Sequence, residues 1–139
     1  MKIMIILVFM ALAGMYRPAR PDYKSMAQDE LTRSIARGKD VYGISCAGCH
    51  QVNGEGLSGV FPPLAHSDHL TKDPGKLITV ILKGQNEEIT VNNTKYSTPM
   101  AALDQLTDQQ VADVLNYIGN SWGNQYSTVT PSQVKEKRE

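Results

Sequence analysis

The sequence is poor in aromatic residues and has no excess of either charge. Only 6% of its 139 residues are aromatic, and 14 basic side chains balance 14 acidic ones. Zero formal net charge provides no basic surface of the kind that binds polyanions, so we expect no nucleic-acid partner. The length suggests one domain. With so few aromatic side chains, a bound prosthetic group would supply much of the apolar volume that its core lacks.

No apolar run is long enough to span a bilayer comfortably. The N-terminal run, residues 3–13, follows Met1-Lys2 and ends in Ala11-Leu12-Ala13. A positive start, an apolar stretch and small residues at its end are typical of a signal peptide, so residues 1–13 predict export. An uncleaved N-terminal anchor, and with it association with a membrane, is the alternative.

Three segments follow this leader. Residues 14–24 contain Pro18 and Pro21 and are expected to form a stiff linker. Residues 25–124 carry the periodic apolar pattern and would form the folded domain. The charged residues 125–139 are expected to be a frayed extension.

Both cysteines of the chain fall in one motif, Cys46-Ala47-Gly48-Cys49-His50. C-x-x-C-H is the attachment signature of c-type haem, in which each thiol adds to one vinyl group to form a thioether bond. The histidine that follows is placed to bind iron through Nε2. The sequence therefore predicts one covalently bound haem c held by Cys46, Cys49 and His50.

A structural zinc site is the rival interpretation of these cysteines. Together with His66 and His69 they form a C-x-x-C…H-x-x-H set. The histidines are only two residues apart, the gap to the cysteines is longer than in the usual finger, and His50 would have no role. We therefore favour haem and expect His66 and His69 to be loop residues.

A six-coordinate haem needs a second ligand opposite His50. Met100 follows Pro99 in an uncharged loop, residues 97–103, about half the chain beyond the motif. A thioether is a soft, neutral ligand that favours ferrous iron and raises the reduction potential. The other candidates are His66, His69 and the remaining methionines, which lie in the leader or before the first helix. We predict Met100 as the ligand.

A histidine ligand normally gives its other N–H to a carbonyl group, which fixes the orientation of the ring. The loop of residues 51–64 contains three glycines and two prolines, which exclude a regular element and favour a loop wrapped round a cofactor. A proline carbonyl in this loop is a suitable acceptor, and we predict that it is that of Pro62.

The rest of the pattern is helical with one small hairpin. A first helix is expected to start near residues 25–29 and to run into the haem motif, with Gly38 at a close helix crossing. A second begins after Asp73-Pro74 and stops at Gly84. The last is capped by Thr107 and Gln110 and ends at Gly123-Asn124. Asn92-Asn93 predicts the hairpin.

These residues make the chain resemble class I cytochrome c over about residues 30–122. The motifs that carry the resemblance are Gly38-x-x-x-Tyr42-x-x-x-Cys46-x-x-Cys49-His50, Pro62-x-Leu64, Met100 and Leu115-Asn116-Tyr117-Ile118. The resemblance implies an all-α fold in which helices pack round one covalently attached haem. It implies that Gly38 and Tyr42 cross the last helix near Val114 and Tyr117, that Leu64 packs on the haem and that Pro62 supports His50.

A narrower group is similar in two further stretches, Gly54-x-Gly56 through Phe61-Pro62-Pro63-Leu64 and the ending Ser121-Trp122-Gly123-Asn124. It comprises the cytochrome domains attached to copper nitrite reductases and the cytochrome subunits of membrane-linked dehydrogenases. One departure is His66, where this group often has glycine, and it bears on the local shape of the loop.

The sequence therefore predicts a periplasmic electron carrier with one haem c and the iron ligands His50 and Met100. Its partners would be redox proteins such as a reductase, a dehydrogenase or an oxidase, and it would transform no substrate itself. Segments 41–49, 56–65 and 96–103 are uncharged, so we expect an apolar docking surface. Two alternatives stay open: a fixed electron-transfer subunit of a larger membrane or oxidoreductase complex, and a haem sensor or peroxidase-like protein with an open iron position.

Overall fold

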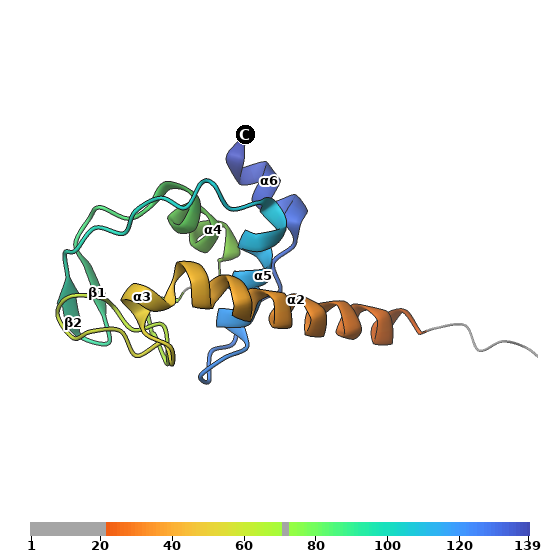
Figure 1. Ribbon diagram of the computed structural model, residues 1–139, viewed down its shortest axis with the longest axis horizontal. Coiled ribbons are helices and arrows are strands. Elements are labelled where there is room, and N and C mark those ends of the chain that lie inside the picture. The colour runs from red at the N-terminus through yellow and green to blue at the C-terminus, as the bar shows by residue number, and fades with distance from the viewer. Residues whose placement is uncertain (1–21, 71–72) are drawn as a thin grey trace, which may run out of the picture.

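The computed structural model describes residues 22–70 and 73–139, so the predicted leader and most of the linker lie outside the described residues. Figure 1 shows how the elements are arranged: the long helix α2 runs across the molecule, α5 packs on it, α4 and α6 pack on α5, and a small hairpin lies at one end. The elements are α2 (Tyr23–Ser45), α3 (Ala47–His50), α4 (Pro74–Lys83), β1 (Ile89–Val91), β2 (Thr94–Tyr96), α5 (Asp108–Gly119) and α6 (Pro131–Arg138). The predicted all-α architecture with a hairpin is confirmed.

The first helix, α2, is longer than expected, because it begins at Tyr23 rather than near residues 25–29. Asp22 caps it by accepting a hydrogen bond from the backbone N–H of Lys24 at 3.3 Å. Residues 22–30 are all exposed, and the first turns of α2 extend away from the rest of the molecule (Figure 1). In the part of the chain that the structure describes, no helix is both long enough and apolar enough to cross a bilayer.

Helices α2 and α5 cross where the glycine in α2 predicted. A Cβ added to Gly38 would lie 1.9 Å from the backbone oxygen of Asp113 and 2.9 Å from Cβ of Tyr117, so only glycine fits this crossing. The rings of Tyr42 and Tyr117 pack beside it with centroids 5.4 Å apart. The predicted crossing is therefore confirmed.

A buried carboxylate fixes the relative position of the same two helices. The side chain of Asp113 in α5 is only 2% exposed. It accepts hydrogen bonds from Ser34 at 2.6 Å, Arg37 at 2.7 and 2.9 Å and Gln109 at 2.9 Å. Burial by itself would raise the pKa of Asp113, but these donors outweigh it and hold the pKa below its ordinary value. The Asp113 carboxylate can accept all of these hydrogen bonds in only one alignment of the two helices. The bonds therefore specify how α2 and α5 align.

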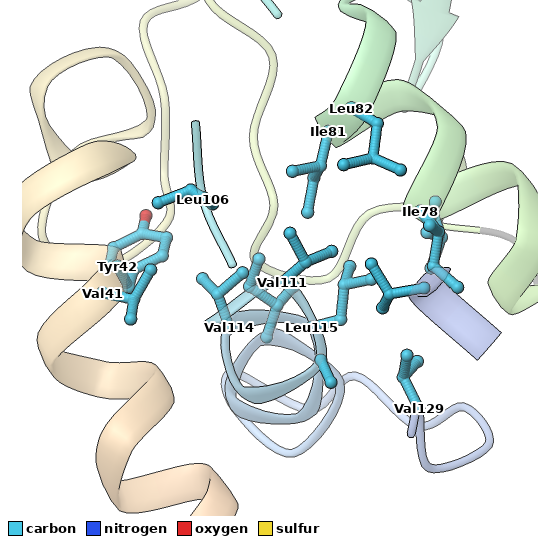
Figure 2. Packing of buried hydrophobic residues seen from close by; sticks show 14 residues of the cluster. Val41, Tyr42, Ile78, Ile81, Leu82, Leu106, Val111, Val114, Leu115 and Val129 are labelled. Carbon is cyan, nitrogen blue, oxygen red and sulfur yellow. The ribbon is translucent and has the colours of Figure 1, made fainter. Parts of the chain in front are cut away.

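The apolar core lies on α5, between α2 on one side and α4 on the other. Figure 2 shows Val41 and Tyr42 of α2 on one side of Val114, with Ile78 and Ile81 of α4 on the opposite side of α5. Val111 and Val114 are completely buried. Their burial contributes about 1.5–3 kcal/mol each, so α5 is the element on which the other helices are assembled.

The helix caps follow the sequence, with one exception at the end of α5. Asp73 accepts from Gly75 N–H at 2.9 Å at the start of α4, and Thr107 and Gln110 form the predicted capping box of α5. Helix α5 ends at Gly119 and not at Gly123-Asn124, because the side chains of Asn120 and Ser121 bond its last carbonyls. Trp122, which falls within the predicted bounds of the last helix, lies beyond the observed end of α5.

The expectation that the C-terminal segment is frayed is wrong. Residues 131–138 form α6, which packs against α4 and α5. Val129 and Val134 are 2% and 0% exposed, and the side chain of Asn116 bonds both the N–H and the carbonyl of Val129. The segment is charged overall, but these two valines join the apolar core cluster of α2, α4 and α5, a contact that only the tertiary fold creates.

The hairpin forms as the sequence predicts. Ile89 pairs with Tyr96 and Val91 with Thr94 in an antiparallel register. Asn92 and Asn93 make the turn with φ angles of 49° and 63°, which asparagine tolerates better than most residues.

Candidate functional site

One cavity of about 860 Å³ brings together every site residue that the sequence singled out. Cys46, Cys49 and His50 line it, as do Pro62 and Leu64 from the following loop, and Met100 from a distant segment. The volume falls in the range of about 300–1,000 Å³ that is usual for cofactor sites.

The C-x-x-C-H motif sits at a sharp change of direction in the chain. Helix α2 ends at Ser45, and α3 turns residues 47–50 back through hydrogen bonds from Cys49 N and His50 N to the carbonyl of Cys46. This single turn places both thiols and the imidazole on the cavity wall. No disulfide joins Cys46 and Cys49, and burial, together with the neighbouring Cys49, raises the pKa of the Cys46 thiol to about 11.

The orientation of His50 is set by the loop that follows it. Nδ1 lies 2.9 Å from the carbonyl oxygen of Pro62, which confirms the predicted contact. With Nδ1 as donor, Nε2 keeps its lone pair and is free to bind a metal. Burial lowers the pKa of His50, although the Pro62 carbonyl opposes the shift, so the neutral ring is favoured.

Gly56 holds the Pro62 carbonyl in place. The N–H of Gly56 donates to the His50 carbonyl at 2.9 Å, and its φ is 63°. A Cβ here would lie 2.4 Å from the oxygen of Phe61 and 2.7 Å from that of Pro62. The loop can therefore close on His50 only because residue 56 is glycine.

Met100 is held by backbone pairing to the end of α4. The N–H and carbonyl of Met100 bond the carbonyl and N–H of Gln85 at 2.8 and 3.0 Å. Gly84, with φ of 76°, leaves room for this approach, because a Cβ there would lie 2.4 Å from the Met100 oxygen. Sequence reasoning identified Gly84 only as a helix stop and missed that it also positions Met100.

Apolar side chains from the two helices α4 and α5 and from the loops before each of them form most of the remaining wall. They include Leu64, Leu70, Leu77, Val80, Ile81, Leu103, Leu106, Val114, Leu115 and Ile118. Such a lining excludes water and keeps the local dielectric low, which strengthens the influence of nearby charges.

A smaller part of the wall carries charged and titratable side chains that do not belong to the predicted haem set. They are His69, Asp73, Lys76, Glu87 and, from the last turn of α6, Lys137. No sequence signal pointed to Lys137, since it lies in a charged C-terminal segment far from every motif.

The rival zinc set is not assembled. His66 is exposed and packs on Gly123, where an added Cβ would lie 2.6 Å from the imidazole carbon Cε1. His69 is also exposed and lines the cavity. Among residues 22–70 and 73–139, no group of three or more His, Cys, Asp and Glu side chains could hold a metal ion.

The backbone conformation at His66 accounts for the departure noted above, a histidine where glycine is common. Its φ of 49° lies in the left-handed region that favours glycine, the residue expected there. The side chain of Asn92 supports this conformation by donating to the His66 carbonyl at 3.2 Å. The loop thus keeps the shape that glycine would adopt.

The residues present fit a haem. Two thiols spaced for thioether bonds and an oriented imidazole lie on one cavity with a thioether side chain, and the wall round them is largely apolar. The donor set, one nitrogen and one soft sulfur, suits iron in a porphyrin and not a hard cation.

The amino-acid sequence is similar to those of known proteins. The family profile described as cytochrome c matches residues 35–122. The chain is 40% identical to cytochrome c-552 of Thermus thermophilus over 117 residues, which are 78% of each protein. It is 33% identical to the cytochrome c subunit of the quinone-type alcohol dehydrogenase of Gluconobacter oxydans over 132 residues, 87% of this chain but 27% of that subunit. With the gluconate 2-dehydrogenase cytochrome c subunit of Pantoea cypripedii it shares 36% over 120 residues, again 27% of the relative.

Proposed function

The chain belongs to the cytochrome c family, and from this premise we propose that it carries single electrons between redox proteins outside the cytoplasm, with His50 and Met100 as its iron ligands. Proteins of this family are electron carriers and not catalysts of substrate chemistry, and they hold a covalently attached c-type haem. The observation that carries the ligand assignment is the shared cavity of Cys46, Cys49, His50 and Met100.

A bound haem supplies the one-electron couple of its iron, and the residues of the chain hold the haem, ligate the iron and exclude water. Cys46 and Cys49 tether the group at one edge. His50, oriented by the Pro62 carbonyl, donates Nε2. Met100 donates a soft sulfur that favours the reduced state, and Leu64 with the other apolar side chains of the wall keeps water away.

The partners are proposed from the relatives. Several of them are cytochrome subunits of dehydrogenases. This favours a dehydrogenase as the electron donor and leaves a fixed subunit of such an enzyme as the second candidate. A free carrier and a subunit differ in fractionation, since only the subunit copurifies with a dehydrogenase on a membrane fraction.

The intact mass of the exported protein tests the haem assignment. We expect one haem to survive denaturation in the wild type, because thioether bonds are covalent, and none in the Cys46→Ser/Cys49→Ser double variant. Haem absorbance on a denaturing gel provides a second readout. A wild-type mass equal to the bare polypeptide, or to polypeptide plus zinc, would contradict the proposal.

Docking is expected to depend on apolar contact. Large apolar side chains flank the haem motif in the chain and are exposed: Ile44 at 87%, Val52 at 74%, Leu57 at 52% and Val60 at 38%. Because the chain also has zero formal net charge, long-range steering should be weak. We expect the second-order rate of electron transfer with the native partner to change little with ionic strength. A steep fall between low and physiological salt would show that charges guide docking instead.

A further inference from the structure

The charged part of the cavity wall has no role in the function proposed above. Two of its members lie at the start of α4, Asp73 as the cap and Lys76 in the first turn, and a third comes from α6. The ammonium of Lys137 in α6 reaches that same turn, since a Cβ added to Gly75 would lie 2.9 Å from Cε and 3.3 Å from Nζ of Lys137. This corner of the cavity therefore carries two lysines from elements that are far apart in the sequence, beside the carboxylate of Asp73, whose Oδ1 would lie 3.1 Å from the same added Cβ; all three side chains are exposed.

A haem carries unlike groups on its two halves. The vinyl groups lie on one half and the two propionate carboxylates on the other, so a haem bonded to Cys46 and Cys49 would have its carboxylates in the part of the cavity away from α3. Helices α4 and α6, which line the cavity with Lys76 and Lys137, make no contact with α3. Carboxylates that are partly shielded from water are stabilised by cations and hydrogen-bond donors. Resting on the haem attachment proposed above, we propose that Lys137 of α6, together with Lys76 of α4, binds the haem propionates, so that the C-terminal helix is part of the cofactor site.

The anchoring of α6 supports this role for Lys137. The neighbouring Arg138 donates to the Asp108 carboxylate at 2.7 Å and to the Asp104 carbonyl at 2.9 Å, and it also bonds the Leu106 carbonyl. Val134, one turn earlier, is completely buried. The last turn is thus held on both sides of Lys137, and the side chain can reach a ligand without first ordering the helix.

Gly75 provides the space for this approach. It is the second residue of α4, where a larger side chain would meet Cε of Lys137 at 2.9 Å. The absence of a side chain leaves room for the end of the Lys137 side chain at the first turn of α4. Lys135, two residues before, is exposed and does not line the cavity, so it offers a matched control on the same helix.

The charge of Lys137 has two consequences that can be measured. A cation beside the haem favours the reduced iron, which carries one positive charge fewer, so it raises the reduction potential. It also favours ionised propionates and keeps their pKa low, in a setting where His69, Asp73, Lys76 and Glu87 are the other titratable groups of the cavity wall. Removal of Lys137 should therefore lower the potential and move its pH-dependent fall to higher pH.

Spectroelectrochemical titration of the haem-loaded protein over a range of pH tests the proposal. For Lys137→Gln we expect a lower potential and a pH dependence displaced to higher pH. We expect Lys137→Arg, which keeps the charge, to restore both, and Lys135→Gln to match the wild type. Titration curves of Lys137→Gln that superimpose on those of Lys135→Gln would overturn the assignment of Lys137. Intact mass of the same samples separates this result from a failure of the proposed function, in which the wild type would carry no haem.

Discussion

Replacement of Gly38 by alanine is expected to lower the free energy of unfolding by about 3 kcal/mol, the upper end of the usual range for overpacking. The added Cβ would lie 1.9 Å from the Asp113 oxygen and 2.5 Å from its carbonyl carbon, which are backbone atoms that cannot rotate away. The two helices would have to separate, and the hydrogen bonds that Ser34 and Arg37 donate to Asp113 would lengthen.

The same helix contains a matched control. Gly43 lies five residues later in α2, is exposed, and has nothing within 4 Å of an added Cβ. Gly43→Ala should stabilise the protein by roughly 0.5–1 kcal/mol, since alanine is the better helix former. Urea unfolding of the two variants therefore gives opposite signs for one chemical change. Equal midpoints would show that α2 and α5 do not meet at Gly38.

The second large effect is expected for Met100→Ala, which should lower the reduction potential by on the order of 100 mV or more. Axial ligands move haem potentials over roughly 0.8 V, and loss of the sulfur removes the group that favours ferrous iron. The weak long-wavelength band of the oxidised protein should disappear, and cyanide or carbon monoxide should gain access to the iron.

Met26→Ala is the control for this variant. Met26 is 56% exposed at the start of α2 and does not line the cavity, so its loss should change neither the spectrum nor the potential. If Met100→Ala also keeps the wild-type spectrum and potential, another residue is the ligand. His69 would then be the first to examine, because it lines the cavity whereas His66 packs on Gly123. A wild type that already binds carbon monoxide would favour an open iron site.

The features that the sequence predicted well depend on residues close together in the chain. The haem motif needs five consecutive residues, and the caps at Asp73 and Thr107 bond partners two or three positions away. The hairpin needs only the two asparagines of its turn. The close helix contact at Gly38 was also predictable. A glycine in the middle of a helix costs about 1 kcal/mol in helix propensity, so its presence indicates a close contact, but it does not identify the residue on the other helix.

Features that the sequence did not reveal depend on contacts between distant segments. The earlier start of α2 is a small example. The first residues of this helix are polar, so no apolar periodicity indicates where the helix begins. The packing of α6 is the major one. Val129 and Val134 are two apolar residues in a polar stretch, and their burial depends on contacts with the core formed by distant helices, which no local pattern describes.

By itself, then, the sequence determined the haem-attachment motif and the helical class, and it was enough to propose the histidine ligand, because the groups involved are neighbours in the chain. Only the tertiary structure decided which residues surround that chemistry. Gly84 places Met100 through a backbone approach, and Lys137 reaches the start of α4 from about sixty residues away. Such contacts arise from the packing of α4, α5 and α6 on one another, and packing is a property of the assembled helices.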